Sequence, residues 1–337
     1  MPASHRRRAP SVPSILAIVL ATLAVAWLAI RRQPAGEPSL QTAARTCFRV
    51  GYLEITASAP LFVARDRDLF SQHGVCIYAT PFGDSDRLVD ALAADRLDYV
   101  VETSAVPALA LEARDPGRFS ITAASRISED APFDAILVRD TSGITSLSDL
   151  AGRRIAVFPG TTDARLLRDY LGSVGVDTAG IEMVPTPPAS QLASLRSGVV
   201  DAAHVFEPFW TIGLSEPGLR ELFGTVFGRQ LAPNPQGVSL LNARTARRSP
   251  DESAALVSVF DSALALMDRS PDDARATLAE HFDLPRDAAR TMHLLYMDGH
   301  ARIDWDAVSA YADLLRSLGE LEGRPEVRSL AFPKTTS

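Results

Sequence analysis

Hydrophobic positions along the chain follow two different periods. Short runs rich in β-branched and aromatic residues alternate with longer runs in which apolar residues recur every three or four positions. We predict strands at 47–53, 75–80, 98–101, 119–124, 134–139, 154–158, 181–184, 200–205 and 237–242. We predict helices between them at 61–71, 85–94, 104–113, 147–151, 162–174, 189–197 and 207–213. This alternation is typical of α/β domains with largely parallel sheets.

The pattern changes after about residue 250, where strand-like runs give way to helical ones. Three prolines stand near the starts of helical runs, where a missing amide costs little: Pro250, Pro271 and Pro285. We expect the last four helices at 253–269, 271–281, 285–298 and 305–318.

The first 32 residues have the pattern of an export signal or a membrane anchor. A basic cluster, His5 to Arg8, precedes an apolar stretch from Val12 to Ile30. As a helix this stretch would be roughly 28 Å long, close to the roughly 30 Å hydrocarbon core of a bilayer. Its length favours an uncleaved anchor, whereas Ala24-Val25-Ala26 resembles a signal-peptidase site. Either interpretation places the chain beyond a polar linker at 33–45 outside the cytoplasm.

Export makes the two cysteines informative. Cys47 and Cys76 each open a strand-like run, and a helical pattern lies between the two runs. A strand–helix–strand unit often makes neighbouring parallel strands about 4.8 Å apart, which brings matching strand starts within disulfide reach. In an oxidising compartment we therefore predict a disulfide between them. The alternative is two small buried core residues.

Composition and charge exclude several classes of function. The 337-residue chain has a formal net charge of −7 even though five arginines precede residue 33, so the remainder is acidic. An acidic surface disfavours nucleic-acid binding, and two cysteines are too few for a Cys-ligated zinc or iron–sulfur site. The later histidines lack metal-ligand or triad spacing: His73, His204, His281, His293 and His300. We predict no catalytic residue, no metal and no cofactor.

Hydroxyl residues gather where predicted strands give way to helices. Each is explained by helix capping when it is considered alone. Together they are also what a ligand site needs, because strand ends and helix N-termini share one edge of an open α/β sheet. These residues are Thr56, Ser58, Thr103, Ser104, Thr161 and Thr162.

Several stretches carry a family pattern. The clearest is GITSLSDLAGRRIAV at 143–157, which is followed by Pro159-Gly160-Thr161-Thr162. The others are 49–52 with 60–64, 88–98, and 195–203 with Glu207-Pro208. In this order and spacing, residues 48 to about 242 resemble the substrate-binding proteins of ABC importers for nitrate, alkanesulfonates, taurine and thiamine-precursor pyrimidines.

The resemblance implies a type II periplasmic-binding-protein fold, in which two α/β lobes enclose a ligand cleft and C-terminal helices pack on the first lobe. We expect the first lobe at 46–134 and 240–330, the second at 135–239, and a tail at 331–337, with crossings near 133–139 and 236–242. It also implies a monomer that binds a small solute by hinge closure and passes it to permease and ATPase subunits.

Five further residues are candidate ligand contacts: Tyr52, Glu54, Glu102, Glu207 and Trp210. Tyr52 and Trp210 can stack on a ligand or pack in a core. Glu54 is equally suited to be a solvated loop carboxylate, whereas Glu102 follows two valines and should lie at the sheet edge. By resemblance, Thr161 and Thr162 are the best ligand donors, and Glu207 lies at the cleft or in a hinge ion pair.

These carboxylates bear on the class of solute. Glutamates at the strand ends, with no obvious arginine, favour a neutral or cationic nitrogenous solute such as a pyrimidine over a sulfonate or nitrate. An oxyanion held by helix N-termini stays open, as does a membrane-tethered sensory or accessory binding module. An enzyme like the pyrimidine-synthesising relatives is disfavoured because their cysteine-rich segment is absent.

Overall fold

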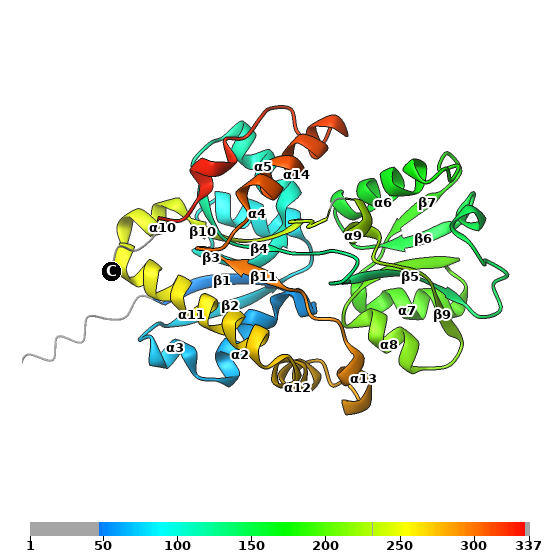
Figure 1. The fold of residues 1–337 in the computed structure, drawn as a ribbon, viewed down its shortest axis with the longest axis horizontal. Coiled ribbons are helices and arrows are strands. Elements are labelled where there is room, and N and C mark those ends of the chain that lie inside the picture. The colour runs from blue at the N-terminus through cyan, green and yellow to red at the C-terminus, as the bar shows by residue number, and fades with distance from the viewer. Residues whose placement is uncertain (1–46, 231, 334–337) are drawn as a thin grey trace, which may run out of the picture. The chain divides into compact units, whose positions relative to one another are not determined.

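Two separate β-sheets, each covered by helices, organise the protein (Figure 1). The computed structural model describes residues 47–230 and 232–333. The predicted export segment at 1–32, the linker at 33–45 and the end of the predicted tail lie outside these residues. Within the described ranges, none of the helices combines the length and the apolar character needed to span a bilayer. We call each sheet with its helices a lobe.

The first lobe contains a six-stranded mixed sheet. Its strand order is β11-β4-β10-β3-β1-β2. The strands are β1 (Phe48–Leu53), β2 (Ile77–Phe82), β3 (Tyr99–Ser104), β4 (Phe119–Ser125), β10 (Gly237–Asn242) and β11 (Met297–Gly299). β1 runs parallel to β2 and β3, whereas β10 is antiparallel to β3 and β4, and β11 is antiparallel to β4.

The second lobe contains a five-stranded sheet in the order β7-β6-β8-β5-β9. The strands are β5 (Asp134–Arg139), β6 (Arg154–Val157), β7 (Glu182–Pro185), β8 (Ala202–Phe206) and β9 (Leu219–Gly224). β6 is parallel to β7 and β8, but β5 is antiparallel to β8 and β9. Both sheets are therefore mixed. The strands that directly precede or follow a passage between the lobes are β4, β5, β9 and β10, and they pair antiparallel with their neighbours.

Helices connect most of the strands. Those before the second sheet are η1 (Thr56–Ser58), α2 (Ala59–Asp66), α3 (Leu69–Gln72), α4 (Ser85–Ala93) and α5 (Ala105–Arg114). Those of the second lobe are η2 (Leu147–Leu150), α6 (Thr162–Ser173), α7 (Pro188–Ser197), α8 (Phe209–Ser215) and α9 (Val226–Gln230). Those that follow β10 are α10 (Ala243–Arg248), α11 (Pro250–Arg269), α12 (Pro271–His281), α13 (Arg286–Thr291), α14 (Trp305–Ser317) and η3 (Val327–Leu330).

The C-terminal helices pack on the first lobe, as the family resemblance implied. The long helix α11 lies along α2 (Figure 1). Phe260 of α11 stacks on Tyr99 of β3, with ring centroids 4.6 Å apart. Burial of these aromatic rings is one of the largest apolar contributions that a residue pair makes to a core.

Three parts of the predicted pattern are wrong or missing. The helix expected at 285–298 ends at Thr291. Residues 297–299 form the strand β11 instead, because they pair with β4 at the edge of the first sheet. An apolar run of this length fits a buried strand as well as a helix. β9 and the short helices α9 and α10 were not predicted, since their sequences lack clear strand or helix periodicity.

Two segments carry the chain between the lobes, at 126–133 and 225–236. They touch through an antiparallel bridge between Ile127 and Asn234, whose backbone hydrogen bonds are 3.2 and 2.7 Å long. The crossings expected at 133–139 and 236–242 are instead the strands β5 and β10, inside the sheets. The expected boundary at 239/240 falls within β10, which pairs entirely with first-lobe strands.

A disulfide joins Cys47 and Cys76, as predicted, with their Cα atoms 4.5 Å apart. It lies where β1 and β2 begin, and the Phe48 amide donates a 2.8 Å hydrogen bond to the Cys76 carbonyl. The 29-residue separation corresponds to about 3–4 kcal/mol of stabilisation.

Candidate functional site

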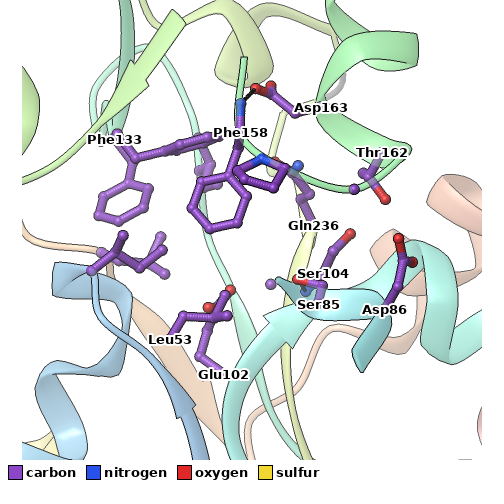
Figure 2. A pocket seen from close by; sticks show the side chains of 17 residues that line it. Leu53, Ser85, Asp86, Glu102, Ser104, Phe133, Phe158, Thr162, Asp163 and Gln236 are labelled. Atoms are coloured by element: carbon purple, nitrogen blue, oxygen red, sulfur yellow. Dashed lines mark hydrogen bonds between the residues drawn. The ribbon is translucent and has the colours of Figure 1, made fainter. Parts of the chain in front are cut away.

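A small cleft of about 60 Å³ lies between the lobes. Residues of both sheets and of both crossing segments line it (Figure 2). The lining comprises Leu53, Ile55, Ser85, Asp86, Glu102, Ser104, Ile127, Phe133, Phe158, Pro159, Gly160, Thr162, Asp163, Phe206, Gln236, Gly237 and Leu295.

The buried acid of the first-lobe wall is Glu102, near the end of β3. Its side chain shares a face of the strand with Val100, because side chains alternate along a strand. Glu102 is only 7% exposed, and its Oε2 atom has no hydrogen-bond partner. Burial raises the pKa of Glu102 to about 8. The site therefore favours the neutral acid, which can both donate and accept a hydrogen bond.

Close packing of backbone holds Glu102 in place. A Cβ on Gly237 of β10 would lie only 2.5 Å from the Glu102 Oε1 atom, so a side chain at 237 would displace the carboxyl. Next to it, the Ser104 amide donates a 3.0 Å hydrogen bond to Ser85 Oγ, which ties the end of β3 to the start of α4. This part of the first-lobe wall is thus polar and is held by β3, β10 and α4.

Aromatic side chains form much of the opposite wall. Phe133 ends the first crossing segment, Phe158 follows β6, and Phe206 ends β8. The rings of Phe133 and Phe158 lie 6.0 and 5.8 Å from that of Phe206. Figure 2 shows Phe133 and Phe158 across the cleft from Leu53 and Glu102. A flat, partly apolar ligand would fit between this aromatic wall and the carboxyl.

The loop before α6 completes the second-lobe wall. Gly160 has a φ of +100°, a conformation that L-residues rarely adopt. This turn places Thr161 and Thr162 at the N-terminus of α6, where the first amides lack intrahelical partners. The Asp86 carboxylate of α4 accepts a hydrogen bond from the Thr161 backbone, so the first lobe touches this loop.

The buried imidazole of His204 supports the second-lobe wall on the side away from the cleft. His204 of β8 lies between Asp163 and Asp134, with Nδ1 2.6 Å from Asp163 Oδ1 and Nε2 3.0 Å from Asp134 Oδ2. Burial lowers the pKa of His204, but the two carboxylates outweigh burial and raise it to about 10. Asp163 also accepts a 2.6 Å hydrogen bond from the Phe158 amide. The cluster therefore joins β5, β8 and α6 behind the aromatic wall.

Three of the predicted contact residues line the cleft: Glu102, Ser104 and Thr162. Thr161 is adjacent to it through its backbone contact with Asp86. Tyr52 packs in the first-lobe core against Phe62, with ring centroids 5.7 Å apart.

The remaining first-lobe candidates lie away from the cleft. Glu54 is exposed, and Ser58 is buried outside the lining. Thr103 points to the opposite face of β3 from Glu102. Thr56 donates through Oγ1 to the Glu207 carbonyl at 3.0 Å and thereby links the two lobes.

Glu207 and Trp210 belong to a different region, a groove between α8 and the segment around α13. Glu207 is buried and forms no ion pair; Thr211 donates to it through its amide and hydroxyl, and His293 through its amide. Burial raises the pKa of Glu207 to about 7, against the effect of these donors. Trp210 stacks on His293 with centroids 4.5 Å apart and donates to Glu221 at 3.0 Å.

Several lining residues escaped the sequence analysis. Asp86 resembles an ordinary acidic residue in the first turn of a helix, and Phe158 and Phe206 resemble core residues of strands. A position at or just after a strand end is the signal that could have identified both phenylalanines. Ser85 begins α4 and Gln236 immediately precedes β10, and neither was among the predicted contact residues.

The ionisable residues that line the cleft are all acids. Glu102, Asp86 and Asp163 contribute carboxyls, and none of the described residues that line it is a lysine or arginine. Burial raises the pKa of Asp86, the Thr161 hydrogen bond lowers it, and Asp84 and Asp90 raise it further. Across the described ranges, no group of three or more His, Cys, Asp or Glu side chains has the arrangement of a metal site.

Two α/β lobes joined by paired crossing segments, with a cleft between them, define a periplasmic-binding-protein fold. A sequence model of the NMT1-like family matches residues 41–282, and the chain belongs to this family. A putative aliphatic sulfonates-binding protein of Bacillus subtilis is 25% identical over 233 residues, which are 68% of this chain and 68% of that protein.

Solved structures show the same fold. The alkanesulfonate-binding protein SsuA of Xanthomonas axonopodis pv. citri, bound to MOPS, superposes with a TM-score of 0.70 at 22% identity, covering 85% of this chain and 97% of its own. The nitrate-binding protein NrtA of Synechocystis gives a TM-score of 0.68 at 14% identity, covering 86% and 85%. These three proteins are named as binding proteins, which agrees with the predicted non-enzymatic class.

Proposed function

We propose that this protein is the extracytoplasmic solute-binding protein of an ABC importer. A monomer would bind a small solute between the lobes by hinge closure and deliver it to permease and ATPase subunits. Membership of the NMT1-like family and the binding-protein fold support this role. The paired crossing segments are suited to act as the hinge, because they carry the chain from one lobe to the other.

The solute is a small nitrogen-bearing molecule, neutral or cationic, with an aromatic or otherwise flat apolar part. Glu102 supports this assignment most directly. A buried polar atom without a partner is costly, and Glu102 Oε2 is such an atom beside the cleft. A ligand N–H group would supply the missing partner, while the phenylalanine wall would cover the ligand's apolar face.

A second candidate solute is a small oxyanion. The relatives described above are named for aliphatic sulfonates and nitrate, and the N-terminus of α6 is at the cleft. Helix N-termini bind anions through free amides and the helix dipole. Asp86 opposes this candidate, because a carboxylate that faces an anion weakens its binding.

Thermal-shift screening of the full-length purified protein tests the solute class. The panel comprises pyrimidines, flavins, taurine, alkanesulfonates, nitrate and bicarbonate. A ligand at 100 times its Kd stabilises the folded state by about 2.7 kcal/mol, which gives a clear rise in Tm. A nitrogenous hit is expected. A hit confined to sulfonate, nitrate or bicarbonate would contradict the proposed solute class.

Substitutions at Glu102 define how the solute is held. Glu102→Ala should weaken binding of the hit at least tenfold, because the ligand N–H loses its acceptor. Glu102→Gln keeps one donor and one acceptor, so it should be mild for a neutral ligand and as severe as Glu102→Ala for a cation. The exposed Glu322→Gln is the matched control and should bind as the wild type does. Equal affinity of Glu102→Ala and the control would remove Glu102 from the site.

Uptake measurements separate an importer component from a sensory module with the same fold. Cells that lack this protein should lose uptake of the radiolabelled solute identified in the screen. Complementation with the wild-type protein should restore uptake, and Glu102→Ala should not. Unchanged uptake in the deletion strain would favour the sensory or accessory module instead.

A further inference from the structure

Asp86 belongs to the first lobe, yet its carboxylate reaches the second. It lies in the first turn of α4 and accepts a hydrogen bond from the Thr161 backbone. Its Oδ2 atom is 3.0 Å from the position that a Cβ on Gly160 would occupy. Figure 2 shows the Asp86 side chain directed toward the segment that carries Thr162. The carboxylate therefore spans the cleft at this point.

The group that Asp86 meets is the N-terminus of a twelve-residue helix, α6. The first amides of a helix have no intrahelical acceptor, and the aligned peptide dipoles give this end a partial positive charge. Gly160 leaves room for the approach because it has no side chain and adopts a positive φ. Asp86 thus lies beside the end of α6 that would also attract an anion.

None of the described residues that line the cleft is a lysine or arginine that could pair with Asp86. Arg87, the next residue of α4, is exposed and pairs with Asp84, 3.4 Å away. The other acids of the lining, Glu102 and Asp163, share its sign of charge when ionised. Asp86 therefore gains its favourable electrostatic contact from the opposite lobe.

The structure assigns Asp86 two linked roles: it is a built-in anion that helps to hold the lobes together, and it excludes oxyanions from the cleft. This inference rests on the proposed solute-binding function and explains how the acidic cleft would select against sulfonates and nitrate. A solute without negative charge can enter beside Asp86, whereas an oxyanion must compete with it for the α6 amides.

The test compares Asp86→Ala with Asp90→Ala, which removes the same charge from an exposed position on the same helix. Sulfate and methanesulfonate affinities are measured by isothermal titration calorimetry on the full chain. Removal of Asp86 should increase these affinities at least tenfold relative to Asp90→Ala. Circular dichroism melting confirms that both variants are folded.

Lobe separation provides the second readout, and it requires no solute. Spin labels on exposed positions of the two lobes, introduced as Arg247→Cys and Ser197→Cys, report the distance distribution by pulsed electron paramagnetic resonance. Asp86→Ala should add a second population of molecules in which the distance between the two labels has changed. Asp90→Ala should keep the wild-type distance distribution.

Asp86→Asn separates the two roles of the carboxylate. Its amide oxygen can still accept from Thr161, so the distance distribution should stay closer to the wild type than that of Asp86→Ala. Because Asp86→Asn removes the negative charge, this variant should still bind sulfate and methanesulfonate more tightly than the wild type does. The inference is overturned if, in Asp86→Ala, either the anion affinity or the distance distribution equals that of Asp90→Ala. Failure of the solute screen would instead refute the proposed function, because neither readout here depends on that solute.

Discussion

Buried carboxyls on the two sides of the cleft are partnered in opposite ways. In the second lobe, Asp134 and Asp163 are both bonded to His204, and each also accepts from backbone amides. In the first lobe, Glu102 is similarly buried but leaves Oε2 without a partner. The same kind of group is thus satisfied internally on one side of the cleft and left incomplete on the other.

This difference indicates which buried acids serve the fold and which serves the ligand. A fully partnered carboxylate holds elements in place, and His204 with its two aspartates does so for β5, β8 and α6. Glu102 Oε2 forms no such bond, which is why the proposed function assigns this acid to the ligand. Each of the following predictions tests one side of this contrast.

The largest expected effect comes from removing the shared partner in the second lobe. His204→Ala leaves Asp134 and Asp163 buried without their counter-charge, which should destabilise the protein by about 3–5 kcal/mol. Urea unfolding measures the loss. His73→Ala, at an exposed position, is the control and should change stability little. A loss below about 1 kcal/mol for His204→Ala would show that the cluster is not a structural unit.

A smaller, pH-dependent effect is expected at Glu102. Its pKa is about 8 in the folded protein, above the ordinary 4.5, so unfolding releases its proton between these values. The stability therefore falls as pH rises from about 4.5 to 8, by about 3 kcal/mol at pH 7. Glu102→Gln abolishes this dependence and should be more stable than the wild type at pH 7, but not at pH 4.

Urea unfolding at a series of pH values measures this effect. The exposed Glu322→Gln should retain the wild-type slope. A Glu102→Gln variant with that same slope would mean that Glu102 is not held as a neutral acid, and the contrast between the lobes would disappear.

The smallest expected effect concerns Glu207, whose partners are neutral donors. Thr211→Val removes the 2.9 Å hydrogen bond from Thr211 Oγ1 to Glu207 Oε1 and should cost about 1–2 kcal/mol. Losing this donor raises the pKa of Glu207 further, so the cost should be greater at pH 8 than at pH 5. Thermal unfolding at both pH values measures it, with the exposed Thr141→Val as the control. A pH-independent loss would argue against Glu207 as its cause.

Much of the fold was predictable because it depends on local periodicity. Alternating strand and helix patterns located most elements, and the two cysteines at matching strand starts indicated their disulfide. The direction of β5 and β10 was not predictable in this way, because a strand pattern is the same for parallel and antiparallel pairing.

The site was predictable only where strand ends and helix starts define it. Glu102 and Thr162, which line the cleft, were predicted as ligand contacts by this rule. Tyr52 was a misleading candidate, because it shares a strand face with Val50 and points into the first-lobe core. Asp86 could not be recognised from sequence, because the contact that distinguishes it is with Thr161, which lies in the opposite lobe and is distant along the chain.

The position of β2 and β7 at the sheet edges affects how the protein behaves when it is concentrated. Exposed strand edges are templates on which a second copy can add a strand, and such addition leads to aggregation. β2 contains Pro81 and β7 ends at Pro185. Proline has no amide hydrogen, so it interrupts the row of donors that an incoming strand would need. One edge of each sheet is therefore protected against strand addition, which favours solubility at high abundance.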